Sequence, residues 1–163
     1  MVAKTDFSPA EWQQVLLAPQ ITSLVIILAS PSGPVGATKE LIAASKLMAD
    51  AIKKASGNAL IDAVAADLKD KMEKKEKLEP PQLSKDPNET KKQCLQACRD
   101  LAALLSQKAP TEAEGYKQWV YQAAKLSSEA AKEGSFLGFG GERVSAAELA
   151  ALSEIATALG IAA

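Results

Sequence analysis

The chain of 163 residues contains no histidine. Histidine is the only side chain whose ordinary pKa lies between 5 and 8, and it is the commonest metal ligand in proteins. Its absence excludes Ser-His-Asp and Cys-His nucleophile arrangements, His-ligated zinc enzymes and haem-histidine proteins. An enzyme built on carboxylates remains as an alternative, but no pattern fixes two carboxylates together in a cleft. We therefore expect a protein that is not an enzyme.

Aromatic residues and excess charge are also scarce. Only 4% of the residues are aromatic, so leucine, isoleucine, valine and alanine must build the core. The 19 basic and 20 acidic residues leave a net charge of −1, which gives no electrostatic footprint for nucleic acid or an acidic membrane. The hydrophobic share of 47% is typical of a globular protein of one domain.

Targeting signals are lacking as well. Residues 1–7 show no basic-then-apolar signal pattern. The most apolar stretch, residues 15–29, is interrupted by Pro19, Gln20, Thr22 and Ser23. We interpret it as a buried helix that is too short to span a bilayer, and we expect a cytoplasmic protein without membrane insertion.

Four sites have the sequence of a helix start, in which a capping residue is followed three positions later by glutamate. A proline stands at the first helical position in two of them, where its missing N–H costs nothing. No stretch alternates like a strand, so the sequence predicts an all-α fold. The four starts are Ser8-Pro9-Ala10-Glu11, Asp86-Pro87-Asn88-Glu89, Thr111-Glu112-Ala113-Glu114 and Ser145-Ala146-Ala147-Glu148.

Breakers and apolar spacing divide the chain into about seven helices, which we expect to form a bundle. We predict these helices at residues 8–18, 19–30, 36–55, 58–79, 87–108, 112–132 and 145–159. The last is expected to bury Leu149, Leu152, Ile155 and Leu159. Residues 69–79 are highly charged and are interpreted as a solvated helix end, with an interaction tail as the alternative.

The chain is expected to form one helical domain over residues 1–163, with two pseudo-symmetric halves as a further prediction. The halves would be residues 8–78 and 87–160, joined by the proline-containing segment 78–87. Residues 29–50 and 131–158 each contain a helix end, a glycine-containing loop and a new helix with a Glu-Leu pair, at Glu40 and Glu148. Chance similarity between alanine-rich helices is the alternative explanation.

These loops resemble those of TerB-like tellurite-resistance proteins. The matching positions are Glu133-Gly134, Val144-Ser145 and Glu148 in the second half, and Ser32-Gly33, Val35 and Glu40 in the first. The resemblance implies a helical bundle with pseudo-twofold character and a cation-binding patch formed by acidic loop residues. The chain departs from the family pattern at Ser32, where aspartate is usual, and by an insertion over residues 135–143.

Four glutamates, Glu40, Glu133, Glu142 and Glu148, could converge if the two loops lie side by side. Carboxylates suit a hard divalent cation such as Ca²⁺ or Mg²⁺, and this is the cofactor we predict. The competing interpretation is local: Glu148 would complete the capping box of Ser145, and Glu40 would be a first-turn residue favoured by the helix dipole.

Residues 134–141, which read GSFLGFGG, form the most unusual segment. Four glycines permit backbone conformations that other residues avoid. Phe136 and Phe139 would act as anchors for a protein partner, or as plugs at the end of the bundle in the alternative interpretation.

Cys94 and Cys98 lie one helical turn apart on an apolar stripe. Soft-metal, oxyanion or redox chemistry is one interpretation, but we expect both thiols to be buried in the core. Together the patterns predict a TerB-like, stress-associated protein that binds a cation or a protein partner through its two loops. The alternative is a helical interaction module that uses the Gly/Phe loop.

Overall fold

The computed structural model describes residues 2–30, 33–132 and 144–162, and the side chains of these residues except 33–41, 43, 131 and 132. Within these residues the chain is all-helical and contains no strand. It forms a short 3-10 helix, Lys4–Asp6, and six α-helices. These are α1 (Pro9–Ala29), α2 (Gly33–Lys53), α3 (Ala59–Glu73), α4 (Pro87–Lys108), α5 (Pro110–Lys132) and α6 (Ala146–Leu159).

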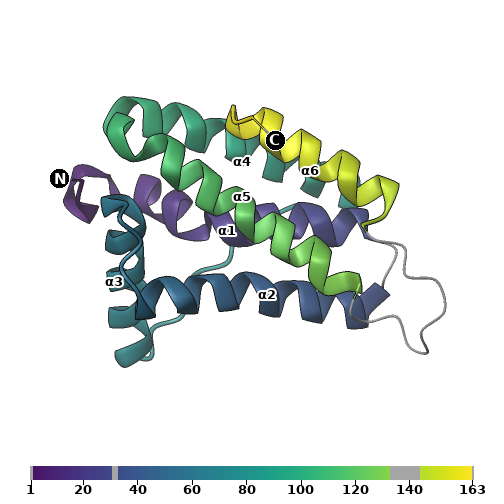
Figure 1. Cartoon of the computed structure of the whole chain (residues 1–163), viewed down its shortest axis with the longest axis horizontal. Coiled ribbons are helices and arrows are strands. Elements are labelled where there is room, and N and C mark those ends of the chain that lie inside the picture. Colours follow the sequence, from purple (N-terminus) through teal and green to yellow (C-terminus); the bar gives the residue numbers. More distant parts are fainter. Residues whose placement is uncertain (1, 31–32, 133–143, 163) are drawn as a thin grey trace.

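Helix α1 lies at the centre of the bundle and packs against every other helix. Figure 1 shows α1, α2 and α5 running along the long axis, with α3 across one end. The buried residues form one core cluster to which all six of these α-helices contribute, α2 through Met48. The bundle confirms the predicted all-α class, but the described residues form six α-helices, and the predicted count of about seven is not confirmed.

The difference in count arises at Pro19, where the sequence predicted a boundary and the structure has a continuous helix. A proline inside a helix leaves the carbonyl four residues earlier without its usual N–H donor. That carbonyl belongs to Val15, and the hydroxyl of Tyr116 on α5 donates to it at 2.7 Å. Tyr116 is fully buried, so no water is needed to satisfy the carbonyl.

A second set of hydrogen bonds supports α1 just after Pro19. The Thr22 hydroxyl lies 3.1 Å from the carbonyl oxygens of Pro19 and, across the helix interface, Val120. The Ser23 hydroxyl donates to the Pro19 carbonyl at 2.8 Å. Both side chains are buried, and each hydroxyl has a carbonyl partner there. The Thr22 bond joins α1 to α5, and the Ser23 bond stays within α1.

The length of α1 also bears on the membrane prediction. As one helix of 21 residues it is long and apolar enough to cross a membrane, by length and composition only. However, 61% of its most apolar window is buried inside the bundle, and core helices commonly pass the same test.

Three predicted helix starts are confirmed, at Ser8, Asp86 and Ser145. The fourth is wrong, because α5 begins at Pro110 rather than after Thr111. Glu114, the glutamate predicted to complete the capping box of Thr111, lies 3.1 Å from Lys117 instead. The carboxylate of Glu112 accepts a hydrogen bond from the backbone N–H of Ala59, at the start of α3.

The start of α3 lies tightly against α5. Asn58 caps α3 by accepting from the N–H groups of Leu60 and Ile61, and its side-chain amide donates to the Glu112 carbonyl at 2.9 Å. A Cβ at Gly115 would lie 2.7 Å from the Asn58 amide nitrogen. Glycine at position 115 therefore permits the close approach of the two helices.

One further boundary and one core position differ from prediction. Helix α2 begins at Gly33, since Pro34 falls in its first turn, where proline is tolerated. Leu149 is 57% exposed rather than buried. The Glu148 carboxylate, turned back to cap Ser145, occupies the buried position that the prediction gave to Leu149.

We predict that Tyr116→Phe lowers the free energy of unfolding by about 1–3 kcal/mol, because the buried Val15 carbonyl loses its donor. The cost should fall by at least about 1 kcal/mol when Pro19 is also replaced by alanine, whose N–H can reach the same carbonyl. Urea denaturation of the two single variants and the double variant measures this coupling. An equal cost in both backgrounds would show that the hydroxyl does not compensate for the proline.

Candidate functional site

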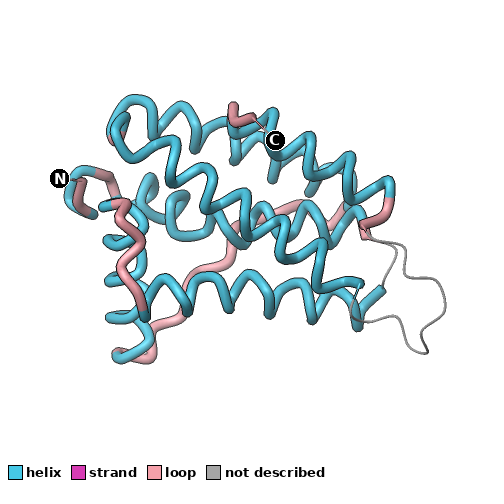
Figure 2. Tube along the Cα trace, in the orientation of Figure 1, coloured by secondary structure: helices cyan, strands magenta, loops and turns pink. Residues whose placement is uncertain are grey.

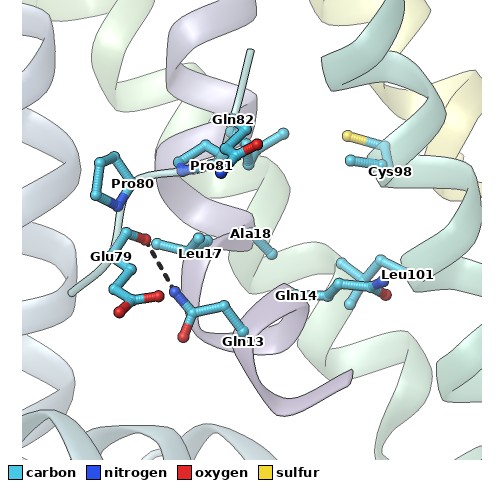
Figure 3. Close-up of a pocket in the computed structure, with 12 residues that line it drawn as sticks. Gln13, Gln14, Leu17, Ala18, Glu79, Pro80, Pro81, Gln82, Cys98 and Leu101 are labelled. Atoms are coloured by element: carbon cyan, nitrogen blue, oxygen red, sulfur yellow. Dashed lines mark hydrogen bonds between the residues drawn. The ribbon is translucent and has the colours of Figure 1, made fainter. Parts of the chain in front are cut away.

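A cavity of about 270 Å³ opens between α1, α4 and the segment that connects α3 to α4. Figure 2 shows that connecting segment as an irregular stretch between the two helices. Figure 3 shows side chains from all three parts around the cavity. Its lining residues are Gln13, Gln14, Leu17, Ala18, Ile21, Glu79, Pro80, Pro81, Gln82, Ala97, Cys98 and Leu101.

Residues 79–82 form one wall of the cavity and will be called the strap. Two adjacent prolines have no backbone N–H, so this part of the chain cannot form a helix or pair as a strand in the usual way. The side chain of Gln13 instead donates to the backbone carbonyl of Glu79 at 2.9 Å, as Figure 3 shows. This bond ties the strap to α1.

Anchors at both ends fix the position of the strap. Leu78 and Leu83 are half-buried and pack against the core. Beyond Leu83, the Ser84 N–H donates to the side chain of Gln93 at 2.8 Å, and the Thr90 hydroxyl donates to the Ser84 carbonyl at 2.8 Å. The strap therefore spans the gap between α1 and α4 with fixed ends.

The lining of the cavity is mostly apolar, and its polar groups are chiefly amides. Three glutamines, Gln13, Gln14 and Gln82, offer both donors and acceptors. Glu79 is the single ionisable residue besides Cys98, and no lysine or arginine stands among the lining residues. The site can therefore hydrogen-bond a neutral group, but it offers an anion no cationic partner.

The Cys98 thiol lines the cavity but is not poised for nucleophilic chemistry. Burial raises the pKa of Cys98 to about 12, and burial raises the pKa of its neighbour Cys94 to about 11. A thiol must lose its proton to act as a nucleophile or metal ligand. Both cysteines are free and buried, which confirms the prediction that they belong to the core.

The four predicted cation ligands are described only in part. Glu148 is 4% exposed, and its Oε2 accepts from the backbone N–H and the hydroxyl of Ser145, both at 2.8 Å. Its local role is thus the capping box. Glu40 lies in α2, but its side chain is outside the described part of the structure, as are Glu133 and Glu142.

The predicted partner anchors, Phe136 and Phe139, also lie outside the described residues. Among residues 2–30, 33–132 and 144–162, no group of three or more acidic or cysteine side chains is placed to hold a metal ion. The cation and anchor hypotheses stay predictions.

Sequence reasoning missed the cavity. The apolar stripe containing Cys98 and Leu101 and the adjacent prolines of the strap were both visible in the sequence. Nothing local indicated that they would meet α1 around one space. A glutamine pair on the first helix, at Gln13 and Gln14, was the remaining signal.

Comparisons with protein families, with curated proteins and with solved structures give no match.

The raised pKa values predict how stability depends on pH. The folded state holds the protons of Cys94 and Cys98 more tightly than the unfolded chain, whose thiols have an ordinary pKa near 9.0. Stability is therefore lost as pH rises above about 9, by up to about 1.4 kcal/mol per pH unit for each thiol.

Denaturation of the protein and of the Cys94→Ala/Cys98→Ala variant between pH 8 and 10.5 measures this effect. The variant is less stable throughout, because alanine leaves space in the core, but its stability should fall less steeply with pH. Equal slopes would mean that the thiols are not protected from ionisation.

Proposed function

We propose that the protein is a non-enzymatic binding protein that holds a small, uncharged and largely apolar ligand in the cavity between α1, α4 and the strap. The observation that carries this proposal is the composition of the lining, in which apolar side chains surround three amides and no cation. Known small-molecule sites share this pattern of an apolar enclosure with a few polar groups that orient the ligand.

The dimensions and chemistry of the cavity restrict the ligand. A volume of about 270 Å³ lies near the lower end of ligand sites, which run from roughly 300 Å³ upward, so the ligand is small. Glu79 and the lack of a lysine or arginine in the lining disfavour an anion. A protonated thiol at Cys98 presents a polarisable, weakly polar surface, which supports binding rather than covalent chemistry.

We predict that a neutral probe, N-methylbenzamide, causes saturable NMR shifts of the backbone amides of Gln13, Leu17, Cys98 and Leu101. Benzoate, which has a similar shape and a negative charge, should bind at least about tenfold more weakly for want of a cationic partner. Ala97→Leu places a larger side chain in the lining and should abolish the shifts.

Ala103→Leu is the matched control, because Ala103 is exposed on the same helix and does not line the cavity. It should bind the probe as the original protein does. Shifts that do not saturate, or that survive Ala97→Leu, would contradict a ligand site at this place.

A second candidate function retains the sequence-based hypothesis of a TerB-like, stress-associated protein that binds a divalent cation. The specific support is Glu148, whose Oε1 is buried and has no hydrogen-bond partner among the described residues. A buried carboxylate oxygen without a partner is costly, and a cation is one group that could satisfy it.

We predict for this candidate that Ca²⁺ or Mg²⁺ raises the melting temperature of the metal-stripped protein, with Mn²⁺ and Zn²⁺ as comparison ions. Glu148→Gln should remove the rise, because glutamine preserves the capping box but not the charge. Variants Glu40→Gln, Glu133→Gln and Glu142→Gln test the other predicted ligands.

Glu129→Gln, at an exposed position of α5, is the control and should leave the rise unchanged. If no cation changes the melting temperature, Glu148 is a helix cap only.

A further inference from the structure

A second concave surface, separate from the cavity, lies where the ends of α2 and α3 meet. It encloses about 560 Å³ and will be called the trough. Helix α2 contributes Ser45, Met48, Ala49 and Ile52, helix α3 contributes Leu68, Lys71 and Met72, and the chain beyond α3 contributes Glu76, Lys77 and Leu78.

The trough exposes apolar surface that the described part of the chain does not cover. Met72 is 69% exposed, the highest value among the large exposed hydrophobic residues of the described chain. Ile52 and Leu78 are half-buried at the sides, and Met48 is buried below them. Methionine adapts its shape to a partner and is frequent at surfaces that bind apolar helices.

Lys71, Lys77 and Glu76 are the charged residues that line the trough among the described residues, and the two segments that supply most of its lining are more positive than the whole protein. Residues 46–54 and 69–77, which include the ends of α2 and α3, contain eight lysines and four acidic residues. The complete chain has a net charge of −1, so positive charge is concentrated at this end. A surface of this kind attracts a partner of opposite charge and favours its association.

Some of these lysines form ion pairs with acidic side chains at the surface, and these ion pairs are weak. Lys71 lies 3.4 Å from Glu76, and Lys74 lies 2.7 Å from Asp70, with both acidic side chains more than half exposed. Exposed pairs contribute little to stability, so a partner's carboxylates could replace these acceptors at small cost.

We propose that the trough binds an amphipathic helix of another protein, whose apolar face is bordered by aspartate and glutamate. The apolar side chains of such a helix, spaced three and four residues apart, would contact Met48, Ile52 and Met72. Its acidic border would lie against Lys71 and Lys77. This proposal does not rest on a ligand in the cavity.

An anionic membrane is the competing occupant, and the shape of the trough disfavours it. A lipid surface is flat on this scale and cannot fill a concavity of about 560 Å³, whereas the side chains of a helix can.

The test is binding of a fluorescein-labelled amphipathic peptide with leucines on one face and glutamates elsewhere, followed by fluorescence anisotropy. A second peptide carries lysine in place of every glutamate. We expect the acidic peptide to bind at least about tenfold more tightly than the basic one, and its affinity to fall with added salt.

Met72→Asp and the double variant Lys71→Glu/Lys77→Glu should each weaken binding of the acidic peptide about tenfold or more. Leu149→Asp is the control: Leu149 is another exposed apolar residue, 57% exposed on α6 and away from the trough, and its replacement should leave binding unchanged. Circular dichroism checks that each variant is folded.

Equal binding of both peptides, or binding that Met72→Asp leaves intact, would overturn the proposal. Cosedimentation with phosphatidylglycerol vesicles is the remaining measurement. Vesicle binding that Met72→Asp abolishes, without binding of the acidic peptide, would assign the trough to membranes instead.

Discussion

The hydrogen bond from the Tyr116 hydroxyl to the Val15 carbonyl is the interaction on which the remaining structure depends. It supplies the donor that Pro19 lacks, and it does so from inside the core, where an unsatisfied carbonyl is costly. Because α1 continues through Pro19, it can contact every other helix. The cavity depends on the same continuity, since Gln13 precedes the proline and Ile21 follows it, yet both line one space.

Local signals in the sequence predicted much of the fold. The caps at Ser8, Asp86 and Ser145 are made by neighbouring side and main chains, so short sequences suffice to predict them. The prediction failed at Pro19 because its compensation comes from a residue about one hundred positions later in the chain. The failure at Thr111 has a local cause: α5 begins with Pro110 at its first position, where proline is favoured, and the prediction passed over that proline.

The candidate site was less predictable than the fold. The buried stripe of α4 was evident from spacing, and the prolines of the strap were evident from composition. A cavity exists only where such surfaces fail to meet completely, and that depends on side-chain volumes from three separate parts of the chain. The trough could not be predicted for the same reason. The charged run of residues 69–79 was visible in the sequence, but its packing beside the end of α2 was not.

The strap and the trough have one further relationship, which concerns mechanical linkage. Leu78 is a wall of the trough, and Pro80 is a wall of the cavity. Glu79, the residue between them, also lines the cavity, so consecutive residues, with Cα atoms about 3.8 Å apart, line the two concave surfaces. A displacement of Leu78 therefore pulls on the cavity wall. The chain therefore links the two sites mechanically. The hydrogen bond from Gln13 to the Glu79 carbonyl holds the strap to α1 and opposes such a displacement.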